Sequence, residues 1–172
     1  MPNLSNADIL TRPANQEGQT FNRSMDVIDT GFSEMASTII PFGFALCQGV
    51  AFNCCILPVN VDSVFKGFAV QINAFEKRPL TTINADDRFG YPSLAAPLTY
   101  ALNYISLGRI AVPCSTAMAI GASVFFVYTA DVAGERVGMV RNSANTLKAK
   151  VIANARVIIP ATAAGICVVE LF

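Results

Sequence analysis

The stretch from Leu98 to Thr129 shows the clearest alternation of hydrophobic and polar positions along the chain. Three runs within it alternate with period 2 and are rich in β-branched and aromatic residues: 100–105, 110–112 and 124–128. This period is typical of strands, and the glycines between the runs are turn residues. The pattern therefore predicts a meander of three short strands, which is a scaffold without catalytic groups.

The rest of the chain after Met25 also has the pattern of short strands. Further strands are predicted at residues 39–40, 42–50, 64–75, 136–141, 150–160 and 166–172. No long run has the i, i+3, i+4 spacing and the caps of a helix. Roughly nine short strands with frequent turns predict an all-β fold, either a small β-barrel or a jelly-roll-like sandwich.

Residues 150–160 give a long alternation outside the central stretch. One face of this predicted strand is expected to hold Val151, Ala153, Ala155, Val157 and Ile159. The opposite face is expected to hold Ile152, Asn154, Arg156 and Ile158. Successive side chains of a strand point to opposite faces, so the segment is predicted to be one regular strand.

The segment Met1–Ser24 differs in composition from the β-domain predicted at residues 25–172. It is rich in Asn and Gln, and its large apolar residues are only four: Leu4, Ile9, Leu10 and Phe21. Such a segment cannot bury enough surface to offset its ordering entropy, so an extended N-terminal arm is expected. Either the arm has no role or it becomes ordered on a partner, and in that case these four residues are expected to dock.

The most polar interior stretch is Glu76–Pro97, which contains several prolines and charged residues. It is predicted to be a long surface loop, and loops of this length are usually functional. Three of its residues are candidates for contact with a partner: Arg88, Phe89 and Tyr91. The adjacent Asp86 and Asp87 do not have the spacing of a calcium loop, so no metal site is predicted.

Composition limits the possible partners. Hydrophobic residues make up 53% of the chain and charged residues 14%, against roughly a quarter charged in an average soluble domain. The excess indicates either a membrane segment or a large surface buried against copies of the chain or another protein. Twelve basic and twelve acidic residues are scattered without a basic run, which argues against nucleic-acid binding.

The membrane alternative applies to residues 39–59, which carry no charge. This stretch is long enough for a spanning helix, but Pro41, Gly43, Gly49 and Pro58 interrupt it. Two buried strands around a glycine turn are therefore expected, and no membrane partner is predicted. The N-terminus lacks the pattern of a signal peptide, so the protein is expected to be made in a reducing cytoplasm.

Catalytic chemistry finds little support. The chain has no histidine, which removes the commonest general base and excludes Ser-His and Cys-His nucleophile pairs. The glycines do not form a phosphate-binding pattern. Five cysteines lie in apolar runs without a CxxC pair and are expected in the core: Cys47, Cys54, Cys55, Cys114 and Cys167. No enzyme, cofactor or metal is predicted, although a Glu/Asp acid–base pair assembled by the fold stays open.

Two structural functions remain. One is an oligomeric binding or coat module that hides apolar surface in subunit contacts. The other is a cell-surface or adhesive β-domain, which would require a signal peptide and paired cysteines. The sequence has neither pattern, so the coat module is favoured.

Six short motifs follow one another between Thr38 and Phe172. They are Ile40–Leu46, Phe65–Val70, Leu102–Val112, Gly121–Val127, Ala155–Val157 and Gly165–Leu171. Their order resembles that of the bacteriophage capsid decoration proteins known as structural cement proteins. Members of that family commonly have Asp where this chain has Ala122.

The resemblance implies a small β-barrel or jelly-roll-like domain on the outside of an icosahedral phage head. It implies the major capsid protein as a partner, whose neighbouring subunits the protein would clamp without enzymatic activity. It also implies a homo-oligomer, with a trimer favoured and a dimer possible, and assembly in the host cytoplasm. The alternatives are a tail or fibre component of the virion, or a soluble β-barrel enzyme.

Overall fold

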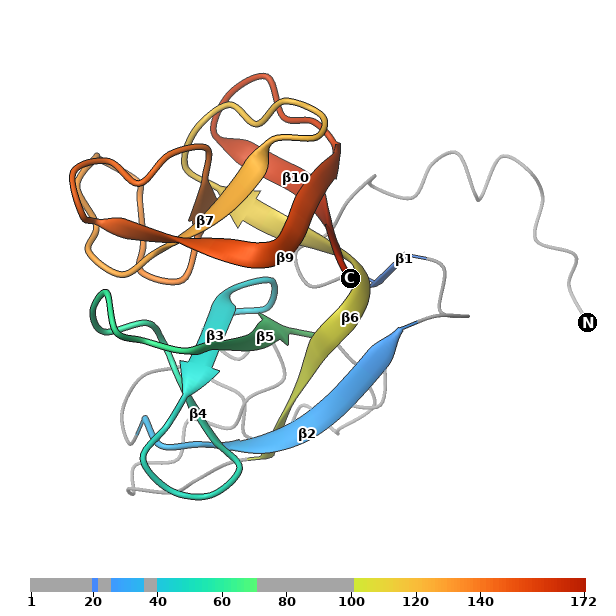
Figure 1. Ribbon diagram of the computed structural model, residues 1–172, viewed down its shortest axis with the longest axis vertical. Coiled ribbons are helices and arrows are strands. Elements are labelled where there is room, and N and C mark those ends of the chain that lie inside the picture. Colours follow the sequence, from blue (N-terminus) through green and yellow to red (C-terminus); the bar gives the residue numbers. More distant parts are fainter. Residues whose placement is uncertain (1–19, 22–25, 36–39, 71–100) are drawn as a thin grey trace, which may run out of the picture.

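The computed structural model describes residues 20–21, 26–35, 40–70 and 101–172, and these form ten strands and no helix (Figure 1). The strands are β1 (Thr20–Phe21), β2 (Val27–Ser33), β3 (Ala45–Gln48), β4 (Cys54–Ile56), β5 (Phe65–Ala69), β6 (Ala101–Cys114), β7 (Ser123–Val127), β8 (Val140–Arg141), β9 (Ala149–Ile159) and β10 (Gly165–Leu171). The all-β prediction is therefore confirmed.

Strand pairing closes two rings that share the long strand β6 (Figure 1). The C-terminal ring runs from β6 through β10, β9, β7 and β8 back to β6. The N-terminal ring runs from β6 through β2, β4, β3 and β5 back to β6. Closure leaves few unpaired sheet edges, which protects a strand-rich chain from edge-to-edge aggregation. Of the two predicted architectures, the barrel is the one found.

Strand β6 corrects the prediction of a turn between residues 105 and 110. It continues without a break through Gly108, whose φ of +121° lies outside the range that L side chains favour. A Cβ at Gly108 would lie 2.1 Å from Asp26 Oδ1, so glycine admits a close neighbour here instead of making a turn. At this point β6 changes partner, because Leu107 pairs with β2 and Gly108 pairs with β10.

The regular alternation predicted for residues 150–160 is also wrong. Ile152, Ala155 and Val157 are buried, whereas Val151 and Ala153 are exposed. The register explains the change, because Arg156 pairs with Ser123 while Ile152 pairs with the next residue of β7. The intervening residues form a bulge, which reverses the face that points into the core.

The uncharged stretch at residues 39–59 forms the two strands expected of it. Strands β3 and β4 are antiparallel, with Cys47 opposite Ile56 and Gly49 in the connection. No helix among the described residues is long and apolar enough to cross a membrane. Strand β3 is shorter than predicted because Gly43, with a φ of +76°, forms a turn before it.

Two other segments differ in length from their predictions. Of the strand predicted at residues 136–141, only β8 forms, since Met139 N donates to Arg136 O and closes a turn. The strand predicted at 64–75 corresponds to β5, and its part beyond residue 70 lies outside the described residues. The last predicted strand, residues 166–172, is confirmed by β10.

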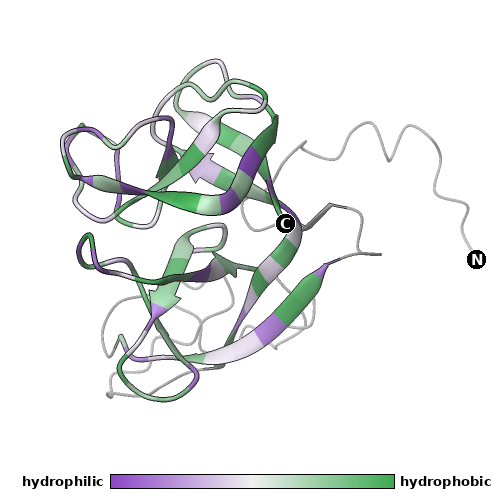
Figure 2. Cartoon of the chain, in the orientation of Figure 1, coloured by the Kyte–Doolittle hydropathy of each residue, from purple (hydrophilic) through white to green (hydrophobic). Residues whose placement is uncertain are grey.

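The core joins the two rings. The larger buried cluster combines residues of the C-terminal ring with residues of β3 and β5: Ile110, Val112, Phe126, Val169, Leu171, Ala45, Cys47 and Phe68. A smaller cluster belongs to the N-terminal ring: Ile40, Leu46, Cys55, Ala69, Leu102 and Tyr104. All five cysteines are buried and free, which confirms their predicted place in the core. In Figure 2 hydrophobic colours accordingly dominate the strands of both rings.

Candidate functional site

The partner-contact residues predicted from the sequence fall almost entirely outside the described residues. These are Leu4, Ile9, Leu10, Arg88, Phe89 and Tyr91. Phe21 is described in its backbone alone, which pairs with Arg109 as part of β1. The described surface offers other candidates, since several large apolar side chains are exposed on it.

The most exposed of these side chains lie on the hairpin tip, residues 49–53, which connects β3 to β4. Val50 is 99% exposed and Phe52 is 97% exposed. Single exposed apolar residues are common on protein surfaces, but two large side chains with almost no contacts on one short turn are not. The hairpin tip is therefore the first candidate for a binding surface.

The Glu34 carboxylate fixes the backbone of the hairpin tip. Its Oε2 accepts a hydrogen bond from Val50 N at 2.8 Å, and its Oε1 accepts one from Ala51 N at 2.6 Å. The bond from Ala51, and after it the bond from Val50, holds the pKa of Glu34 below its ordinary value. A Cβ at Gly49 would lie 2.4 Å from Glu34 Oε2, so the approach of the carboxylate depends on glycine at this position.

Asn53 ties the base of the hairpin tip to two other strands. It has a φ of +57°, a conformation that Asn tolerates better than most residues. Its Nδ2 donates to Thr30 O of β2 at 2.9 Å, and its Oδ1 accepts from Lys66 Nζ of β5 at 3.2 Å. The hairpin tip is thus supported on both sides, and its shape does not depend on the two exposed apolar side chains.

A second loop, residues 57–64, exposes three valines close to the base of the hairpin tip: Val59, Val61 and Val64. Gln48 N donates to Val64 O at 2.9 Å, which places this loop beside the end of β3. Within the loop Ser63 Oγ accepts from the backbone N–H groups of Val59 and Asn60. The loop is therefore also ordered by internal hydrogen bonds.

A third exposed loop, residues 142–148, belongs to the C-terminal ring. Asn145, Thr146 and Leu147 have positive φ values, which are rare for non-glycine residues, and the Leu147 side chain is exposed. Asp131 holds this loop through Asn145 Nδ2 and through an ion pair with Lys148. The strained backbone is stabilised by contacts within the same ring.

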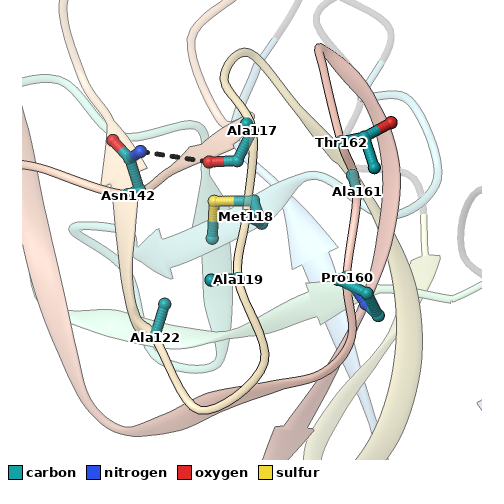
Figure 3. A pocket seen from close by; sticks show the side chains of 8 residues that line it. All are labelled: Ala117, Met118, Ala119, Ala122, Asn142, Pro160, Ala161 and Thr162. Atoms are coloured by element: carbon teal, nitrogen blue, oxygen red, sulfur yellow. Dashed lines mark hydrogen bonds between the residues drawn. The ribbon is translucent and has the colours of Figure 1, made fainter.

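A shallow cavity of about 490 Å³ lies at the C-terminal ring, between the β6–β7 connection and the turn before β10 (Figure 3). It is lined by Ala117, Met118, Ala119, Ala122, Asn142, Pro160, Ala161 and Thr162. Asn142 Nδ2 donates to Ala117 O at 3.0 Å and fixes one wall. Among the described residues that line the cavity, no side chain is an ordinary acid or base, and the only hydroxyl is that of Thr162.

Two carboxylates of the described residues, Glu170 and Glu135, act in structural contacts. Glu170 of β10 forms ion pairs with Arg156 of β9 and Arg109 of β6. Its hydrogen bonds with these two arginines lower the pKa of Glu170, and the bond with Arg156 has the larger effect. Glu135 is buried and pairs with Arg141 at 3.0 Å while accepting a bond from Ser115 Oγ. In this part of the chain no group of three or more Cys, Asp or Glu side chains is placed to hold a metal.

The comparisons with known proteins agree with the motif order along the chain. A family model described as structural cement protein (E217 gp24/Pam3 gp6) matches residues 10–172. The chain belongs to this family. The resemblance inferred from the six motifs is thereby confirmed.

The fold of this cement protein also occurs in a solved structure. A chain in the capsid of Myoviridae phage XM1 superposes with a TM-score of 0.63 at 14% identity. The alignment covers 97% of this chain and 96% of that one, so the likeness in fold extends over the whole domain. No curated protein matches the chain.

The hairpin tip of this cement protein was not predicted as a binding surface. It lies inside the apolar stretch 39–59, where hydrophobicity indicates burial. The predicted strand 42–50 runs through Gly49, and the sequence does not say that the residues beside this glycine form a turn and point into solvent. The one usable signal is a valine and a phenylalanine within four residues after a turn glycine, where polar residues are usual.

Proposed function

We propose that this cement protein decorates the outside of an icosahedral phage head and clamps neighbouring major capsid subunits. The family match over residues 10–172 is the observation that carries the proposal. The likeness in fold to a chain of a phage capsid is consistent with it. The role requires no catalysis, and the family is a structural one.

The architecture suits a clamp. Two closed rings that share β6 and one core form a rigid body that can transmit force between two attachment points. A protein that binds only the expanded lattice stabilises that lattice by its binding free energy. Many copies acting together give a large total effect even when each contact is weak, because each copy bridges two subunits.

We further propose that the protein acts as a homo-oligomer, with a trimer favoured over a dimer. The exposed apolar residues of β2 support self-association: Val27, Ile28 and Phe32. Permanent subunit interfaces are more apolar than ordinary protein surface, so the high apolar content of this chain fits a protein that buries surface against other copies. The N-terminal arm and residues Arg88, Phe89 and Tyr91 are proposed as further contacts with the capsid.

The test is co-sedimentation of the purified protein with expanded, decoration-free heads and with unexpanded procapsids. Saturable binding to expanded heads alone, at a fixed ratio to the major capsid protein, is the expected result. Binding to neither particle would contradict the proposal and favour a tail or fibre component of the virion. Equal binding to both particles would contradict selectivity for the expanded lattice.

A further inference from the structure

We infer that the hairpin tip is a preformed anchor, which inserts Phe52 and Val50 into an apolar pocket on a capsid subunit. This inference rests on the proposed function and names a contact within it. The partner is identified by its chemistry, as a concave surface without charge that accepts one phenyl ring and one valine side chain.

The exposure of the two side chains is the first argument. Phe52 and Val50 are 97% and 99% exposed, so association can remove almost their whole apolar surface from water. Aromatic residues that fill a pocket at the centre of an interface often dominate its binding energy. A projecting phenylalanine on a tight turn has the form of such an anchor.

The rigidity of the hairpin tip is the second argument. Glu34 holds two of its N–H groups, and Gln48 Nε2 donates to Gly49 O at 3.2 Å. Gly49 N also donates to Cys54 O at 2.9 Å across the turn. A loop already held in its bound shape loses little conformational entropy on association, which increases affinity. These contacts order the backbone without using either apolar side chain.

The charge around the hairpin tip is the third argument. Residues 48–61 contain no Lys, Arg, Asp or Glu. Two charged side chains contact the hairpin tip, and both are engaged: Glu34 accepts from the N–H groups of Val50 and Ala51, and Lys66 donates to Asn53 Oδ1. A partner surface therefore needs no complementary charge, and the contact should respond little to salt. The neighbouring valines of residues 57–64 extend the apolar surface around the anchor.

A second copy of the chain is a less suitable receptor. The β6–β7 connection and the turn before β10, which line its shallow cavity, lie at the opposite end of the long axis from the β3–β4 hairpin (Figure 1). Joining hairpin tip to cavity would stack copies head to tail, and such contacts build open chains instead of a closed dimer or trimer. The capsid subunit is therefore the receptor to which the inference commits.

The experiment compares Phe52→Ser and Phe52→Leu with the unchanged protein in binding to expanded, decoration-free heads. Phe52→Ser should weaken binding at least about tenfold, and Phe52→Leu should retain most of the affinity, because an apolar side chain remains. The matched control is Ile120→Ser, which removes a 69% exposed side chain on the β6–β7 connection and should leave binding unchanged. The difference between Phe52→Ser and the unchanged protein should persist at low and high salt.

Three outcomes are separable. Full binding by Phe52→Ser, while the unchanged protein binds, would overturn the anchor and leave the decoration role intact. No binding by the unchanged protein would overturn the decoration role itself. A changed oligomeric mass of Phe52→Ser in light scattering would show that the hairpin tip contacts a second copy, which also overturns the inference. Thermal unfolding of each variant checks that the fold is retained.

Discussion

At the scale of single residues, the carboxylate of Glu34 directly holds the backbone of the candidate binding surface. It is the only side chain among the described residues that accepts hydrogen bonds from the backbone of Val50 and Ala51. A charged acceptor makes stronger bonds with N–H groups than a neutral one. The order of the hairpin tip should therefore depend on the ionisation of this one group.

The first prediction concerns the pH dependence of the hairpin tip. The folded-state pKa of Glu34 is lowered, so the carboxylate contributes its full stabilisation above the ordinary pKa of a glutamate and loses it as the pH falls through the lowered value. The amide signals of Val50 and Ala51 should shift together in that acidic range in an NMR titration. Glu34→Gln should abolish this titration, and an identical titration in that variant would contradict the assignment.

At the scale of elements, the sequence pattern predicted where most strands lie, but it did not predict where a strand continues through a glycine or contains a bulge. Strand β10 was predictable because residues 166–172 form an apolar run that only Glu170 interrupts. Gly108 was misjudged because a glycine between two alternating runs usually marks a turn, while here it makes room for Asp26. The bulge in β9 was hidden, since a register change against β7 leaves no trace in the composition of either strand.

The second prediction tests the role of Gly108 in β6. Gly108→Ala should destabilise the fold by about 1–3 kcal/mol, because its φ is positive and the new Cβ would overlap with Asp26. Gly165→Ala is the matched control, since a Cβ there meets nothing within 4 Å. Urea unfolding should give a lower midpoint for the first variant alone. Equal urea midpoints for the two variants would show that β6 tolerates a side chain at Gly108, where the strand changes partner from β2 to β10.

The third prediction concerns the N-terminal arm. Thr20–Phe21 pair with β6 as β1, so a truncation of residues 1–19 leaves this contact in place. The truncated protein should keep its oligomeric mass but bind expanded heads more weakly, because the apolar residues Ile9 and Leu10 are lost. Ile9→Ser/Leu10→Ser in the full chain should reproduce the loss. Unchanged binding by both variants would show that the N-terminal arm does not contribute to capsid binding.

At the scale of the whole molecule, the two rings are joined by more than the shared strand. Phe65 of β5 stacks on Phe126 of β7 with ring centroids 6.2 Å apart. Ala45 N donates to Gly138 O at 2.7 Å, and Lys150 Nζ donates to Ser63 O at 3.0 Å. The strand pattern predicted a β-domain at residues 25–172, but only the strand pairing shows that the described strands close two rings.

The fourth prediction follows from this joining: the rings should unfold as one cooperative unit. Leu46→Ala removes a fully buried side chain from the N-terminal ring and should cost about 2–5 kcal/mol. If unfolding is global, the Val169 amide of β10 should lose the same free energy of protection in native-state hydrogen exchange. Val151→Ala, at an exposed position of β9, should leave that protection nearly unchanged. Full protection of Val169 in Leu46→Ala would mean that the C-terminal ring folds independently, and the mechanical coupling that a clamp requires would then have to come from the oligomer.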